Sequence, residues 1–128
     1  NQLLDSGRVK LFEGSDGFAA GEQRRDFIYV DDVAAVNIWC LQNQQCQGVF
    51  NLGTGTSHSF NDVAHAVIDW HGYGEIEYVP FPESLRGHYQ SFTEADMTAL
   101  REAGYEGRFM TVVEGVRRYM DVVEQRGI

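Results

Sequence analysis

Polar and apolar residues alternate over two short stretches of the chain, and this pattern predicts β-strands. Residues 8–12 and 75–79 both place polar and apolar side chains in turn, as a half-buried strand does. The apolar and aromatic runs at 27–30 and 49–52 predict two further strands that are more fully buried. Pro80 and Pro82 end the strand at 75–79. We therefore expect three or four short strands and a small sheet.

Apolar residues in the remaining segments recur at helical spacing. Asp31 or Asp32 is expected to cap a helix that runs to about Gln42, and this helix is apolar almost all round. A helix of that kind packs against neighbours on more than one side. Strands that alternate with helices predict an α/β fold.

Three capping-box patterns predict the starts of three further helices. In this motif a Ser or Thr oxygen and an acidic residue three positions later satisfy free N–H groups reciprocally. The pattern occurs at Ser59, at Thr93 and at Thr111, and Gly104 is expected to end the second of these helices.

The first residues predict the last turn of a helix that ends at Gly7. Because the chain starts in mid-element and without Met, we expect residues 1–128 to be one fragment of a longer protein. A chain of this length, with 43% hydrophobic residues, is long enough to bury a core.

The overall charge narrows the classes of partner. A net charge of −9 argues against a general binder of nucleic acid or of anionic membranes, and no apolar run approaches the length of a membrane span. Cys40 and Cys46 lie six residues apart without a CxxC motif, which predicts a reduced, cytoplasmic protein rather than a disulfide framework.

Arginine accounts for nine of the ten basic residues, and Lys10 is the only lysine. Arginine suits planar, bidentate recognition of phosphates and carboxylates, which is compatible with a small anionic ligand. Arg25 follows the Gly-rich loop 13–24 directly, so its guanidinium can turn toward whatever that loop encloses. The alternative for Arg25 is a structural salt bridge with Asp26 or with another carboxylate. Glu13 and Asp26 are the carboxylates that we single out as possible site residues.

Two further segments allow more than one interpretation. Gly53-Thr54-Gly55 lies between a predicted strand and a helix, as in dinucleotide-binding motifs, but His58 stands at the third glycine position and an ordinary tight turn is the alternative. Tyr89 lies in a loop with Arg86 and His88, where it can stack on a base, bond a sugar or simply anchor the loop. The four histidines lack metal-binding spacing, so no metal site is predicted.

Taken together, several blocks resemble the C-terminal half of an extended short-chain dehydrogenase/reductase, of the NAD-dependent epimerase/dehydratase family. The shared blocks are Leu11-Phe12-Glu13-Gly14-Ser15, Arg25-Asp26-Phe27-Ile28-Tyr29-Val30-x-Asp32-Val33-Ala34 and Phe50-Asn51-Leu52-Gly53-Thr54-Gly55. Phe-Glu-Gly-Ser, together with residues 76–82 and Gly87-x-Tyr89-Gln90, resembles more narrowly the members of that family that act on ADP-heptose. The resemblance covers essentially the whole chain.

The resemblance implies a ligand and the residues that hold it. In this family NADP transiently oxidises a sugar carbon to a ketone and then returns the hydride to the opposite face. Arg25 is thereby expected to contact the diphosphate of an ADP-sugar and Tyr89 to contact the ligand. The residues expected to line the nucleotide-sugar pocket are Phe12, Glu13, Gly14 and Ser15. A cytoplasmic homo-oligomer that supplies a lipopolysaccharide inner-core precursor is also implied.

The departures from the family decide what this chain can do alone. Its Gly-rich cofactor fingerprint is absent, and so is its Tyr-x-x-x-Lys pair, because the residue four before Lys10 is Ser6. We therefore expect a substrate-binding region without its N-terminal cofactor domain, with segments that would complete a Rossmann domain. Such a chain carries no catalytic or cofactor-binding residues and is inactive alone.

Two alternatives remain open. The chain can belong to another nucleotide-sugar epimerase or dehydratase, or it can be a stand-alone sugar-nucleotide binding module without catalysis. In either case the apolar helix at 33–41 and the strands at 27–30 and 49–52 are expected to be exposed. We expect the isolated chain to self-associate through that surface.

Overall fold

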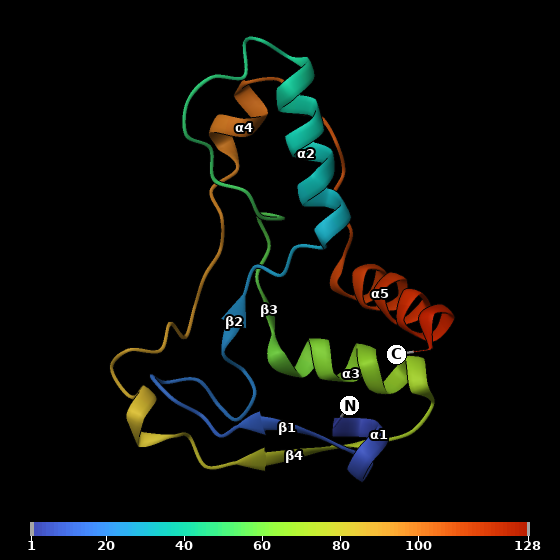
Figure 1. Ribbon diagram of the computed structural model, residues 1–128. Helices are drawn as coiled ribbons and strands as arrows, with labels where there is room; N and C mark the ends of the chain where they lie inside the picture. The colour runs from blue at the N-terminus through green and yellow to red at the C-terminus, as the bar shows by residue number, and fades with distance from the viewer. Residues whose placement is uncertain (1, 128) are drawn as a thin grey trace.

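Residues 2–127 are described by a computed structural model, and they form the α/β fold that the sequence predicts (Figure 1). α2 and α4 lie at one end of the molecule and β1 and β4 at the other, with β2 and β3 running between them (Figure 1). In chain order the elements are α1 (Gln2–Ser6), β1 (Arg8–Phe12), β2 (Arg24–Arg25), α2 (Val30–Gln42), β3 (His58–Ser59), α3 (Phe60–His71), β4 (Glu75–Val79), the 3-10 turn η1 (Glu83–Leu85), α4 (Thr98–Glu102) and α5 (Val112–Arg126).

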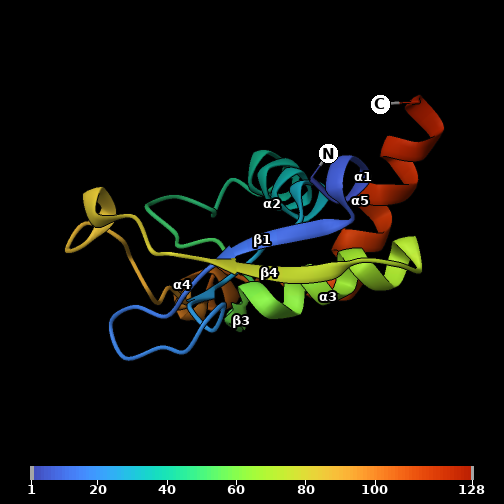
Figure 2. The ribbon, with the colours of Figure 1, turned by 90° about the horizontal axis from the view of Figure 1, so that it is seen from below.

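β1 and β4 pair in parallel, and both strands have the predicted bounds. Their register runs from Arg8 opposite Glu75 to Phe12 opposite Val79. α1 and α3 both contact β1. Because the two strands are parallel, the loops that follow them leave the sheet at the same end (Figure 2). A second sheet consists of the antiparallel pair β2 and β3.

The prediction that the first helix ends at Gly7 is confirmed. Gly7 has a φ of 70°, a left-handed conformation that glycine adopts without steric cost, and its N–H donates to the Leu3 carbonyl over 2.8 Å. The predicted helix also included Asn1, which lies outside the described residues.

Two of the three predicted capping boxes are confirmed. The Ser59 hydroxyl accepts from the Asp62 N–H over 3.0 Å, and the Asp62 carboxylate accepts from the Ser59 N–H over 2.9 Å. Thr111 and Glu114 make the same reciprocal pair at the start of α5. The two helices that begin in this way, α3 and α5, pack against each other.

The capping box predicted at Thr93 is wrong, and the helix is only the single turn α4. Its N-cap is Met97, without a side-chain bond. The backbone before it pairs elsewhere instead, because the Thr93 N–H donates to the Arg24 carbonyl and Phe92 forms a parallel bridge with Arg24. The predicted end is close to the observed one, since Gly104 follows the C-cap Ala103.

The predicted N-cap of α2 is also wrong. Tyr29 holds that position, and its side chain makes no capping bond. Asp31 and Asp32 lie in the first turn instead, where negative charge favours the helix dipole. Asp32 is buried and its carboxylate accepts from the Met110 N–H over 2.8 Å. Its oxygen therefore serves a distant segment rather than its own helix.

Within residues 2–127, α2 packs on one face, and the exposure expected for the isolated chain is found on the opposite face. Val36 is buried, whereas Ile38 is 55% exposed and Leu41 is 85% exposed. The buried face meets a cluster formed mainly by residues near α4, namely Leu100, Tyr105 and Phe109. No second element among residues 2–127 covers the opposite face of the helix.

The strands predicted at 27–30 and 49–52 are not formed within residues 2–127. Val30 begins α2, and the other residues of both segments have no regular structure. A strand needs a neighbour to complete its ladder of hydrogen bonds, and the described part of the chain places none beside these segments. No helix among residues 2–127 is long and apolar enough to cross a membrane.

The start of α5 predicts an unusually acidic carboxyl group. Arg108 donates two hydrogen bonds to Glu114, over 2.9 and 3.1 Å. These bonds, followed by those from Thr111, lower the pKa of Glu114 from 4.5 to about 2. In an NMR titration we expect Glu114 to protonate with a midpoint of about 2, and Arg108→Ala to move the midpoint upward. Arg126→Ala is the control that leaves it unchanged, and an ordinary wild-type midpoint would contradict the expected contact.

Candidate ligand-binding site

A cavity of about 150 Å³ is lined by the last three residues of β1, at the end of the sheet where the loops after β1 and β4 emerge. Ligands of open α/β proteins bind at the carboxyl ends of parallel strands, which is the end in question. The cavity is lined by Lys10, Leu11, Phe12, Gly21, Gln23, Phe60 and Tyr89. Two residues predicted for the site, Phe12 and Tyr89, are therefore among its walls.

Three aromatic rings form one wall of this region. Phe12, Phe81 and Tyr89 meet edge to face, with ring centroids 5.4 Å apart for Phe12 and Phe81 and 5.3 Å apart for Phe81 and Tyr89. Phe12 and Tyr89 complete the triangle at 6.4 Å. Such edge contacts fix the orientation of each ring. Tyr89 is therefore both an anchor of its loop and a wall of the cavity.

Arg25 lies between two aromatic rings at the same place. Its guanidinium carbon is 5.0 Å from the centre of the Tyr89 ring and 5.9 Å from that of Phe60. These are favourable cation–π distances. One guanidinium N–H donates to the Arg24 carbonyl over 3.0 Å. Among residues 2–127 no carboxylate pairs with Arg25, so the alternative of a salt bridge with Asp26 is not realised.

The loop after β1 is held by a buried amide. Gln23 is 2% exposed, and its side-chain N–H₂ group donates to the Glu13 carbonyl over 3.0 Å and to the Ser15 hydroxyl over 3.2 Å. The Gly14 backbone lies so close to the Phe18 carbonyl oxygen that a Cβ at Gly14 would collide with it. Glu13, Gly14 and Ser15 therefore have a fixed backbone at the rim of the site, where Glu13 and Gly14 are exposed.

Five of the seven residues that line the cavity were not singled out from the sequence as site residues, namely Lys10, Leu11, Gly21, Gln23 and Phe60. Gln23 lies between charged residues in a polar loop, where nothing in the local pattern distinguishes a buried amide. Phe60 has the spacing of the apolar face of α3, and its contact with Arg25 becomes visible only in the fold. Two neighbours of Tyr89 do not line the cavity: Arg86 pairs with Glu83 over 2.8 Å and its guanidinium carbon lies 6.0 Å from the centre of the Phe81 ring, and His88 is exposed.

Asp26 lies next to Arg25 and binds backbone from two other segments. Its carboxylate accepts from the Thr54 N–H over 2.8 Å, the Thr54 hydroxyl over 2.6 Å, the Gly55 N–H over 2.9 Å and the Ala95 N–H over 3.1 Å. Burial raises the pKa of Asp26, but these hydrogen bonds outweigh it and the pKa falls below 3.8. Asp26 is therefore a structural group rather than a ligand contact.

This arrangement explains Gly53-Thr54-Gly55 without a cofactor. A Cβ at Gly53 would collide with the Asp26 carboxylate and with the Ala95 side chain, so only glycine allows the close approach. The N–H groups of Thr54 and Gly55 already donate to Asp26. They are not available to a dinucleotide pyrophosphate, and the segment does not fit the cofactor. It is a tight turn built around a carboxylate.

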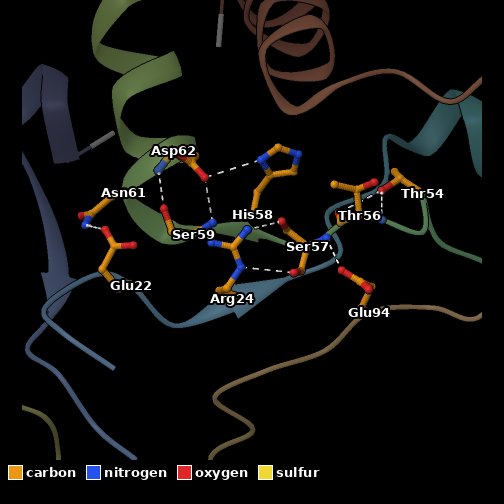
Figure 3. A network of polar contacts seen from close by, with 10 residues as sticks. All are labelled: Glu22, Arg24, Thr54, Thr56, Ser57, His58, Ser59, Asn61, Asp62 and Glu94. Atoms are coloured by element: carbon orange, nitrogen blue, oxygen red, sulfur yellow. Dashed lines mark hydrogen bonds and ion pairs between the residues drawn. The ribbon is translucent and has the colours of Figure 1, made fainter. Parts of the chain in front are cut away.

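A second polar network secures the backbone of β2 (Figure 3). Arg24 donates to the Ser57 hydroxyl over 3.2 Å and to the Ser57 carbonyl over 2.5 Å. The Ser57 N–H in turn donates to Glu94 over 2.9 Å. Figure 3 also shows the Asn61–Glu22 hydrogen bond and the 3.5 Å contact between His58 and Asp62. These bonds fix the strand from which the Arg25 side chain projects.

Sequence and fold both connect the chain with one family. Residues 2–53 match the NAD dependent epimerase/dehydratase family. The resemblance to this family of extended short-chain dehydrogenases/reductases is confirmed. Within it, the chain is similar to the ADP-L-glycero-D-manno-heptose-6-epimerase of Alkalilimnicola ehrlichii, with 55% identity over 122 residues and 95% of this chain. The chain spans 38% of the length of that relative.

Solved structures agree with this assignment of the fold. The ADP-L-glycero-D-manno-heptose-6-epimerase of Helicobacter pylori is 24% identical, with a TM-score of 0.74 over 96% of this chain and 35% of its own. The UDP-glucose 4-epimerase of Thermus thermophilus, solved in complex with NAD, is 25% identical with a TM-score of 0.72, over 94% of this chain and 36% of its own. The α/β fold is therefore that of part of an extended short-chain dehydrogenase/reductase.

Asp26 predicts a pH-dependent contribution to stability. Asp26→Asn keeps one acceptor oxygen but turns an N–H₂ group toward backbone donors, which we expect to cost about 2 kcal/mol at pH 7 in urea unfolding. Because the pKa of Asp26 is lowered on folding, its contribution is present above the unfolded value, near 3.8, and is lost as pH falls through the folded one.

Asp69→Asn is the matched control, because Asp69 is an exposed residue of α3. We expect it to change the free energy of unfolding by less than about 0.5 kcal/mol. Equal stability of the two variants at pH 7, or a difference that does not shrink in acid, would refute the role assigned to Asp26.

Proposed function

We propose that the chain is the substrate-binding portion of an NADP-dependent epimerase. The whole enzyme would invert C6'' of ADP-heptose by transient oxidation and re-reduction, in the synthesis of a lipopolysaccharide inner-core precursor. The 55% identity to an ADP-L-glycero-D-manno-heptose-6-epimerase supports this proposal. The free thiols of Cys40 and Cys46 support a reducing, cytoplasmic setting.

The environment of the Arg25 guanidinium is the observation that supports a phosphate-bearing substrate. A half-buried guanidinium without a carboxylate partner among the described residues is costly unless an anion completes it. The rings of Phe60 and Tyr89 hold the guanidinium beside the cavity. One of its N–H groups donates to the Arg24 carbonyl, and the others can donate to a ligand. Arginine binds phosphate oxygens through two parallel N–H bonds, so a diphosphate matches this group in charge and shape.

The volume of the cavity limits how much of a ligand it can enclose. Its volume of about 150 Å³ is smaller than a complete site for a drug-sized ligand, which is usually 300 Å³ or more. It accommodates a part of a nucleotide sugar rather than the whole. In our proposal Phe12 and Tyr89 pack against that part, and the rim residues Glu13, Gly14 and Ser15 contact it through the backbone and the Ser15 hydroxyl.

The chemistry itself requires groups beyond those described above. The only lysine is Lys10, and it is not part of a Tyr-x-x-x-Lys pair. The Gly53–Gly55 turn is occupied by Asp26 and does not fit a cofactor pyrophosphate. We infer that most of the NADP site is formed by residues other than these 128 and that the chain alone does not epimerise its ligand.

Ligand binding tests the role of Arg25. We expect calorimetric titration to detect binding of an ADP-sugar to the chain and to find it weakened by about tenfold to a hundredfold in Arg25→Ala, the cost of a lost charge-assisted contact. Arg25→Lys keeps the charge but loses the bidentate fork, so its loss should be intermediate.

Arg117→Ala makes the same change of charge at an exposed position of α5 and should bind like the wild type. Equal affinity of Arg25→Ala and wild type would remove Arg25 from the site. Tighter binding of a UDP-, GDP- or dTDP-sugar than of the ADP-sugar would favour another nucleotide-sugar enzyme of the same family.

We also propose that the chain self-associates. Leu41 and Val49 are 85% and 96% exposed, and Ile38, three positions before Leu41 on α2, is 55% exposed. Exposed apolar surface of this extent marks an interaction face. In light scattering we expect the apparent mass to rise with concentration, and Ile38→Glu combined with Leu41→Glu to keep the chain monomeric. A wild-type chain that stays monomeric at every concentration would contradict the proposal.

A further inference from the structure

The C-terminal end of α2 brings two thiols together. The Sγ atoms of Cys40 and Cys46 are 2.7 Å apart, although the residues are six positions apart in the chain. A disulfide bond is about 2.05 Å long, so the two sulfur atoms need to approach by less than about 1 Å to bond. Both thiols are free, and both side chains are partly exposed. The proposed nucleotide-sugar site does not use either residue.

A defined turn, rather than chance proximity, produces this pair. Asn43 ends the helix, where its N–H donates to the Trp39 carbonyl over 3.0 Å and its side-chain amide donates to the same carbonyl over 2.7 Å. The Asn43 carbonyl then accepts from the Cys46 N–H over 2.9 Å. These three bonds fold residues 43–46 back over the last turn of α2.

Cys40 is the better anchored of the two residues. It packs against the cluster of Val36, Leu100, Tyr105 and Phe109, together with Trp39 from the same helix. Cys46 lies in the loop and donates its S–H to Cys40. That hydrogen bond, followed by burial, raises the pKa of Cys46 to about 11, so Cys46 keeps its proton at neutral pH.

We propose that Cys40 and Cys46 form a reversible redox site that takes two electrons from, or returns them to, a small thiol–disulfide couple such as glutathione. The thiolate of Cys40 attacks one sulfur of glutathione disulfide, and one glutathione thiolate leaves. Cys46 then gives up its proton and attacks the Cys40 sulfur of the mixed disulfide, which releases the second glutathione. Two protein thiols are thereby oxidised to one disulfide, and one glutathione disulfide is reduced to two thiols.

The native fold should raise the effective concentration of one thiol at the other, and this increase can be measured. Two cysteines six residues apart also meet in an unfolded chain, so formation of the bond is not sufficient by itself. Because the turn at Asn43 holds the sulfur atoms together, the effective concentration of one thiol at the other must be higher in the native chain than in urea. We expect a difference of about tenfold or more.

The experiment equilibrates the full chain with reduced and oxidised glutathione, traps free thiols by alkylation and measures the intact mass. We expect a monomeric product that has lost two hydrogens, about 2 Da, and takes up no alkyl group. The same titration in concentrated urea gives the unfolded reference. Cys40→Ser and Cys46→Ser, checked for native circular dichroism, should show only the alkylated or glutathione-bound form.

Several results would overturn the proposal. Two alkylated thiols at every glutathione ratio, a mixed disulfide that never resolves, or only disulfide-linked dimers would each exclude an intramolecular site. An effective concentration in the native chain no higher than that in urea would show that the fold contributes nothing. The wild-type comparison between native and urea conditions holds even if a serine variant fails to fold.

Discussion

The carboxylate of Asp26 joins three parts of the chain that are far apart in sequence. Four donors from the turn at 54–55 and from Ala95 converge on its two oxygen atoms. Without this group the backbone N–H groups of both segments would have no partner in a region without regular structure, where unpaired N–H groups are costly. Arg25 is the preceding residue, so the position of its guanidinium beside the cavity follows from where Asp26 is bound.

Several predictions from short-range patterns are confirmed where no distant group competes for the same atoms. The strands β1 and β4 have their predicted bounds, and the capping boxes at Ser59 and Thr111 form because donor and acceptor lie three residues apart. The predictions failed where a distant partner competes for the same group. Thr93 gives its N–H to Arg24, and Asp32 accepts from Met110 across the core.

The same distinction applies to the residues of the candidate site, some of which the sequence predicted while others become visible only in the fold. Arg25 and Tyr89 were singled out from their loops and Phe12 from the resemblance to a family, and the fold then brings their side chains together in one region. Gln23 could not be found by pattern, because an amide becomes a clamp only when its loop folds over it. The strands expected at 27–30 and 49–52 did not form because a strand is defined by its neighbour.

The two arginines of β2 divide their tasks according to which side of the strand they occupy. Arg24 turns toward Ser57 and belongs to the framework, whereas Arg25 turns toward Tyr89 and the cavity. This division rests on a register of only two paired positions, Arg24 opposite Ser59 and Arg25 opposite His58. Since neighbouring side chains of a strand point to opposite faces, a slip of one residue would exchange the two guanidinium groups. A slip of β2 by one residue against β3 would therefore turn Arg24 toward the cavity and Arg25 away from it, while the composition of the site stays the same.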